Sequence, residues 1–294
     1  MPPRTVPAGA WLDAGPFARA AAPSSRADVT LLDPGAAPRA PLRYVAPAVA
    51  AHVERRLRVS FRQDYSPGGA STLTVAPPPW SMSVAMTAPE AADAPWRYHI
   101  GRIEMQAGDA ATNARIFRDV FAGWIPVEGE LALDARGAPT AATRPMFTGH
   151  TSIRANEPIR LLDDVFDAWL VVFPTEPVGV GARWRIIDSV VRGGFTLART
   201  RTFTLVAPAR VVAQVALDVP RDQRVNLVVD GASFTLTMAY WKVTIDAEIN
   251  LDPTSLLPRR ATAKYHLVFL QREEQVEGHT AARPSNLDLS AELN

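Results

Sequence analysis

Residues 172–186, VFPTEPVGVGARWRI, join the two apolar patterns that decide the fold. Upstream the apolar side chains recur with the period of a helix, and downstream they recur with the period of a strand. The prolines stop the helix, Gly179 and Gly181 permit the positive φ of a tight turn, and Trp184 begins a strand that buries it. A dinucleotide-binding loop would need a strand before the glycines, a helix after them and a third glycine where Trp184 stands. We therefore predict a turn at this point rather than a ligand cradle.

The segment before this turn, NEPIRLLDDVFDAWLVVF at 156–173, predicts an amphipathic helix. Asn156 suits the N-cap, and Pro158 suits the first turn. The apolar side chains have the i, i+3, i+4, i+7 spacing of one helix face. They are Leu162, Val165, Phe166 and Trp169.

Three carboxylates, Asp163, Asp164 and Asp167, occupy the opposite face of this predicted helix. Near a helix start they complement the macrodipole, and we expect them to face water. The alternatives are paired carboxylates for acid–base catalysis and a calcium site. A second helical pattern, NARIFRDVFAGWI at 113–125, is explained equally by a short helix and by an irregular strand.

Alternation of apolar and polar residues, typical of half-buried strands, dominates the rest of the chain. In RRLRVSFRQDY (55–65) the apolar side chains share one parity, and WRYHIGRIEMQ (96–106) repeats the pattern. After Trp184 at least five strands follow one another. A phase slip near Tyr240 predicts a β-bulge, and Asp230-Gly231 predicts a hairpin turn.

These patterns predict a mainly β chain, a β-rich α+β fold with a curved antiparallel sheet or half-barrel and one or two helices packed on it. Residues 1–40 are rich in proline and alanine, which predicts a disordered leader. A single β-rich domain is expected over 41–280, beginning with a strand at 42–45, and 281–294 is expected to be a flexible tail.

A weak internal repeat leaves open whether this domain consists of two similar halves meeting near 150–180. GELALDARGAPTAAT (129–143) matches AEINLDPTSLLPRRAT (247–262), and each copy predicts a strand, a turn led by aspartate and a second strand. A duplication and the chance recurrence of a common hairpin sequence pattern explain this match equally.

Composition and charge exclude several classes of partner. The 294 residues carry a net charge of +1 with their charges dispersed, so nothing favours nucleic acid or an anionic membrane. There is no cysteine, which excludes disulfides and thiolate chemistry. The longest apolar runs are too short for a transmembrane segment, and the N-terminal residues lack the apolar region of a signal peptide.

The chain resembles uncharacterised bacterial envelope proteins in two features. They are a helix ending in Pro-x-x-Pro-Val-Gly-x-Gly-x-x-Trp and a following meander that closes with LDPTSLLPRRATAKYHL. It is more distantly similar to the half-barrel lipoprotein-localisation carriers. The resemblance covers roughly residues 155–270. It implies a curved sheet with helices on its concave face and a periplasmic or outer-envelope location, where a signal peptide and a lipidated cysteine would be expected.

No catalytic motif is present in the sequence, so we predict a protein that is not an enzyme and has no cofactor or metal. The histidines are isolated, with no spacing that suits zinc, and His266 is expected on a strand surface. They are His52, His99, His150, His266 and His279.

Aromatic and sulfur-containing side chains provide the candidate binding residues. If helix and sheet enclose a gap, these side chains line it, and a lipid or other apolar molecule is the expected ligand. They are Phe166, Trp169, Phe195, Phe203, Met238 and Trp241. The same side chains would equally fill a solid core. The two hypotheses are therefore a carrier or sensor of an apolar ligand, and a structural or protein-interaction module of the cell envelope, whose protein partners the sequence does not identify.

Overall fold

The structure is a computed structural model that describes ten stretches of the chain. They are residues 28–45, 51–65, 72–91, 94–106, 126–140, 157–192, 195–218, 223–229, 232–275 and 280–294. The predicted second helix at 113–125 and the N-cap Asn156 lie outside these residues.

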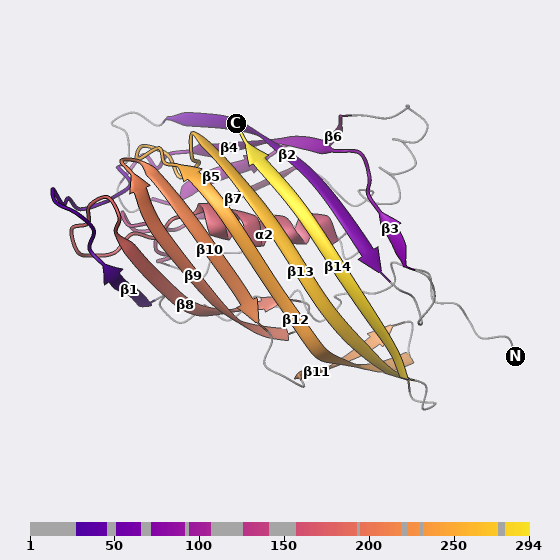
Figure 1. Ribbon diagram of the computed structural model, residues 1–294. Coiled ribbons are helices and arrows are strands. Elements are labelled where there is room, and N and C mark those ends of the chain that lie inside the picture. The colour runs from indigo at the N-terminus through magenta and orange to yellow at the C-terminus, as the bar shows by residue number, and fades with distance from the viewer. Residues whose placement is uncertain are drawn as a thin grey trace, which may run out of the picture.

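One antiparallel sheet contains all fourteen described strands (Figure 1). The elements are β1 (Asp28–Asp33), β2 (His52–Tyr65), β3 (Leu73–Val75), β4 (Trp80–Thr87), β5 (Trp96–Ile100), β6 (Glu104–Met105), β7 (Val127–Leu131), α2 (Glu157–Trp169), β8 (Arg183–Arg192), β9 (Phe195–Ala207), β10 (Arg210–Asp218), β11 (Gln223–Val229), β12 (Ala232–Asn250), β13 (Arg260–Gln275) and β14 (Thr280–Leu293).

The strand order along this sheet is β1-β8-β9-β10-β12-β13-β14-β2-β4-β5-β7, with β11 paired to β12, β3 to β2 and β6 to β4. The C-terminal strand β14 lies between β13 and β2, so it joins the early and late parts of the chain. With β1 and β7 at its two ends, the sheet is open. The prediction of a mainly β chain with a curved antiparallel sheet and a helix packed on it is confirmed.

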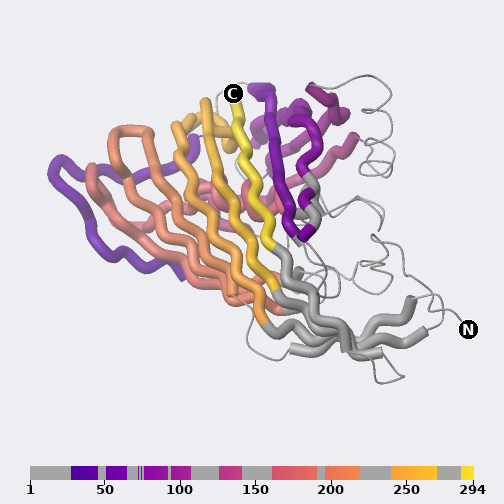
Figure 2. Tube along the Cα trace, turned by 45° about the vertical axis from the view of Figure 1, so that its right-hand side comes forward, coloured from indigo at the N-terminus to yellow at the C-terminus, as the bar shows by residue number. Residues whose placement is uncertain are grey.

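The sheet curves around α2, which crosses its concave face (Figures 1 and 2). Alternation explains which side chains face inward. Strand β10 alternates buried and more exposed residues along its whole length, and Leu57, Val59 and Phe61 of β2 are buried as predicted. Within the described part of the chain, no helix has the length and apolar character needed to cross a bilayer.

The phase slip predicted near Tyr240 is a β-bulge. The pairing of β12 with β13 is regular up to Met238, shifts by one residue, and resumes at Tyr240. Because side chains alternate between the two faces of a strand, the extra residue places the apolar side chains of the following segment on the concave face. Trp241 and Val243 therefore continue the inward row, while Tyr240 is 47 % exposed.

The segment between α2 and β8 is the predicted turn. Gly181 has φ +87°, which disfavours other residues. Gly179 serves a different purpose, because a β-carbon there would overlap the carbonyl oxygen of Ala36. Trp184 follows in β8, fully buried, and its indole nitrogen donates to the carbonyl oxygen of Val172 at 2.8 Å.

Three predicted boundaries are wrong. Residues 28–33 of the expected leader form β1, because Val29 and Leu31 pack against the core beside β8. Residues 42–45 are not a strand; Tyr44 is instead buried in a loop, and its hydroxyl donates to the carbonyl oxygen of Val171. The expected tail is strand β14, because Leu287, Leu289 and Leu293 alternate on the concave face and are buried.

Each copy of the weak repeat contains the predicted aspartate-led turn. Asp134 Oδ1 accepts hydrogen bonds from the backbone amides of Arg136 and Ala138, both at 2.9 Å. Asp252 Oδ1 accepts one from the amide of Thr254 at 3.1 Å. This local geometry is a common device of turns, so a duplication of the domain stays a hypothesis.

Candidate functional site on the concave face

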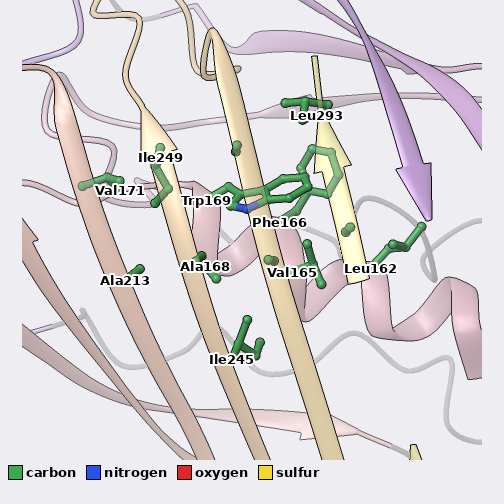
Figure 3. Packing of buried hydrophobic residues seen from close by; sticks show 14 of the residues in the cluster. Leu162, Val165, Phe166, Ala168, Trp169, Val171, Ala213, Ile245, Ile249 and Leu293 are labelled. Atoms are coloured by element: carbon green, nitrogen blue, oxygen red, sulfur yellow. The ribbon is translucent and has the colours of Figure 1, made fainter. Parts of the chain in front are cut away.

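Small side chains on the sheet make room for α2. Four neighbouring strands place an alanine at the same level of the concave face, directly opposite one another in register. We call them the alanine row: Ala213, Ala247, Ala263 and Ala291. The indole nitrogen of Trp169 donates to the carbonyl oxygen of Thr262, the neighbour of Ala263 on β13, at 3.2 Å. Figure 3 shows Trp169 beside Phe166 on the concave side of the sheet. The row therefore forms a shallow seat for the C-terminal part of the helix.

Three of the predicted binding residues belong to the core around this seat. Phe166 and Trp169 lie edge to face with their ring centroids 5.2 Å apart, and both are at most 3 % exposed. Phe203 is fully buried and stacks on Trp184 at 5.7 Å. The structure thus brings Phe166 and Trp169 together, whereas Phe203 has a different aromatic partner.

Trp241 faces the concave side of the sheet, three levels of inward-facing residues away from the alanine row. It is directly opposite Phe269 of β13, with ring centroids 6.1 Å apart, and both side chains are only partly buried. We call this pair the aromatic rim. Phe195 and Met238 lie on β9 and β12, but their side chains are outside the described part of the structure.

A group of ionised side chains lies on β8 and β9, one and two levels away from the alanine row, where Asp167 of α2 reaches these strands. We call it the charged cluster: Asp167, Asp188, Arg199 and Arg201. Asp188 stands directly opposite Arg199 across the β8–β9 ladder. Its carboxylate accepts two hydrogen bonds from Arg199, at 2.7 and 2.6 Å, and one from Arg201 at 3.1 Å.

The helix contributes to the charged cluster through its last turn. The Asp167 carboxylate pairs with Arg199, and Arg201 donates to the Asp167 carbonyl oxygen at 3.4 Å. The last turn of α2 contains no basic residue, so the arginines of β9 provide the positive charge that a helix C-terminus favours.

Burial and pairing act in opposite directions on these groups. Burial raises the pKa of Asp188, but the hydrogen bonds and charges of Arg199 and Arg201 outweigh it and hold the pKa below its ordinary value. Burial lowers the pKa of Arg201 to about 10, assisted by the charge of Arg199. For Arg199, burial lowers the pKa, yet Asp167 and Asp188 more than compensate and raise it. Asp188, Arg199 and Arg201 are therefore charged at neutral pH.

Arg201 is not fully satisfied in this arrangement. Arg201 is 5 % exposed, and its Nε has no hydrogen-bond partner among the residues that the structure describes. An unmade hydrogen bond at a buried donor costs roughly 1–3 kcal/mol. The charged cluster is thus a compromise between pairing and desolvation, and its geometry is that of an ion-pair network rather than of a catalytic base or nucleophile.

The prediction that the helix carboxylates face water is wrong for two of them. Asp163 and Asp164 are 4 % and 5 % exposed, and the charge of Asp164 contributes to the raised pKa of Arg199. Asp167 is the most exposed of the three, with 35 % of its side chain accessible. Within the described residues, no group of three or more histidine, aspartate or glutamate side chains has an arrangement that could hold a metal ion.

The predicted residues did not include the charged cluster, although a signal is present in the sequence. Arg199 and Arg201 share the parity of Leu197 and Phe203, so they fall on the buried face of β9. Charged residues at buried positions require partners. Asp188 likewise alternates with Trp184 and Ile186 on the buried face of β8. His266 is correctly expected on the outer surface, where it pairs with Asp288 at 2.6 Å.

No protein-family model matches this chain, and no curated protein is significantly similar to it. The resemblance to bacterial envelope proteins and lipoprotein carriers thus stays an expectation from the sequence.

Proposed function

We propose that this protein is a non-enzymatic carrier or sensor that holds a lipid or other apolar molecule on the concave face of its sheet. The aromatic rim carries this proposal. Above the rim, the level formed by Leu217, Val243 and Leu267 is at most 3 % exposed. Trp241 and Phe269 continue the same inward parity but are only partly buried. An acyl chain lying against them would complete their burial, which is favourable for large aromatic side chains.

The arrangement of helix and sheet is consistent with this use. The main contacts of α2 with the described strands are with β10, β12 and β13, and its Trp169 donates to the Thr262 carbonyl beside Ala263. The helix therefore covers the upper part of the concave face (Figure 1), and the rim lies three levels away from the alanine row. Ligand sites are lined mainly by apolar and aromatic side chains, and the rim offers two aromatic side chains on the inward face. By resemblance, the proposed location is the periplasm or the outer envelope of a bacterium.

A second candidate function has its own supporting observation. Phe166, Trp169 and Phe203 are at most 3 % exposed, so half of the predicted binding residues are packed as ordinary core. A structural or protein-interaction module of the cell envelope needs such a core and no small ligand.

Titration of the full chain with a fluorescent fatty acid, followed by anisotropy, separates the two functions. The carrier proposal predicts saturable one-to-one binding, weakened about tenfold or more in Trp241→Ala because a large buried contact is lost. Tyr240→Ala is the matched control, since this neighbouring aromatic residue is exposed and follows the opposite parity. Absence of saturation, or equal weakening in both variants, would leave the interaction module as the better account.

A further inference from the structure

At each end of the sheet, an acidic edge strand pairs with a strand that carries basic side chains. At one end, the edge strand β1 carries Asp28 and Asp33, and Asp33 stands opposite Arg183 of β8. At the other end, the edge strand β7 carries Glu128 and Glu130, which stand opposite His99 and Arg97 of β5. Opposite charges directly across a ladder stabilise strand pairing, and like charges disfavour it. The strand that would best continue either end is therefore basic.

The two edges differ in how much apolar surface a new strand would cover. On β7 the inward side chains Val127 and Leu131 are already 3 % and 4 % exposed. On β1 the inward side chains Val29 and Leu31 are only partly buried, and Leu32 at the β-bulge is 46 % exposed. Addition of a strand to β1 would bury this apolar surface, whereas addition of a strand to β7 would bury little further apolar surface.

Among the described strands, β1 pairs only with β8. We propose that the edge of β1 binds an extended segment of a partner protein by β-strand addition. The segment has apolar residues at alternate positions, facing the concave side, and lysine or arginine at the positions opposite Asp28 and Asp33. Main-chain hydrogen bonds supply the affinity in this mode of recognition, and alternate side chains supply the specificity.

A second copy of this chain does not fit the same edge. Antiparallel pairing of two β1 strands about a twofold axis would place Asp28 of one copy opposite Asp33 of the other, and pairing of β1 with β7 would bring acidic strands together. Edge charges that prevent self-association are common in natural sheets. Here they select for a basic partner as well.

The partner's length follows from β8. Because of the β-bulge between Leu31 and Asp33, the six residues of β1 are matched by the five residues 183–187. A five-residue core with basic ends, Lys-Val-Thr-Val-Lys, flanked by serine and threonine, reproduces this spacing and has the same charge pattern in either direction. Asp33 also holds a turn, because its Oδ1 accepts from the amide of Gly35 at 2.8 Å, so Asp28 is the residue to change.

The test is an NMR titration of the isotope-labelled full chain with this peptide. We expect saturable amide shifts confined to β1 and β8, weakened at least about fivefold in affinity by Asp28→Lys and left unchanged by Glu128→Lys, the same charge reversal at the other edge. A peptide with glutamate in place of lysine, and one with proline at the central position, should fail to bind the unaltered protein.

Shifts of equal size with the glutamate peptide, shifts centred on β7, or no saturable shift in β1 would each overturn the proposal. The peptide comparisons use the unaltered chain, so they decide the question even if the Asp28 variant folds poorly. None of these outcomes depends on whether the concave face binds an apolar ligand.

Discussion

Helix α2 meets the sheet through two junctions of opposite chemistry. At the alanine row, Trp169 and Phe166 pack against each other in the apolar core, and Trp169 donates to the Thr262 carbonyl beside Ala263. At β8 and β9, Asp167 meets two buried arginines that share Asp188. An apolar junction gains free energy from burial, whereas a buried ion pair mostly recovers what its desolvation costs. The first junction therefore supplies stability, whereas the second strongly affects stability only when one charged partner is removed.

The largest effect is expected at the charged cluster. Asp188→Asn leaves Arg199 and Arg201 buried without their shared counterion, so the free energy of unfolding should fall by about 3–5 kcal/mol. Urea denaturation measures this change. A loss below about 1 kcal/mol would mean that the arginines find other partners or water, and the contrast between the junctions would disappear.

The apolar junction should respond to added volume rather than to charge. Ala263→Leu places a larger side chain in the alanine row, so the free energy of unfolding should fall by about 1–3 kcal/mol. The control is Lys264→Leu, because Lys264 is the next residue on the same strand and is exposed on the outer face. Equal losses in both variants, again by urea denaturation, would show that the helix does not need the space above Ala263.

A fall in pH should destabilise the junction at the charged cluster and leave the junction at the alanine row unchanged. The pKa of Asp188 is held below its ordinary value of 3.8, so its contribution to stability is present above that pH and is lost as the pH falls below it. The difference in stability between the unaltered protein and Asp188→Asn should therefore narrow as the pH falls from 7 to about 3. The difference between the unaltered protein and Ala263→Leu should stay constant. Thermal unfolding followed at several pH values checks both expectations.

The smallest effect is expected for an ion pair of the outer face. Arg210 and Glu248 are 2.8 Å apart, with side chains 51 % and 61 % exposed. Glu248→Gln should change the free energy of unfolding by less than about 1 kcal/mol, because water screens this pair. A loss similar to that of Asp188→Asn in the same urea assay would show that burial does not set the difference between ion pairs in this sheet.

The sequence predicts what depends on neighbours along the chain. Alternation identifies the strands and their buried parity, the i, i+3, i+4, i+7 spacing identifies α2, and the phase slip identifies the β-bulge at Tyr240. These signals are local because strand and helix periods are properties of short segments.

Contacts between distant segments are less accessible to such reasoning. Asp188 and Arg199 face each other because β8 and β9 form a hairpin, but their link to Asp167 requires the helix to lie across that hairpin. Residues 280–293 have strand alternation as well, yet their place between β13 and β2 depends on strand order, which periodicity does not encode. The alanine row has the same origin, since its members align only through the register of four strands.

The candidate binding residues show the same limit. Periodicity correctly places Trp241 and Phe203 on inward parities, but it does not distinguish a core residue from a rim residue. That difference depends on what lies above each level of the sheet. Phe203 stacks on Trp184, its buried cross-strand neighbour, whereas Trp241 and Phe269 are three levels away from the alanine row and only partly buried.

We propose that the concave face is divided into a packed seat for α2 and a rim that binds an apolar molecule. Native mass spectrometry of the full chain, purified without detergent, tests whether such a molecule is bound. The account predicts a folded protein carrying one additional mass that organic solvent extracts as a lipid or other apolar molecule. Trp241→Ala should lose this mass and Tyr240→Ala should keep it. A bare polypeptide mass that stays bare after incubation with extracted bacterial lipids would contradict the account.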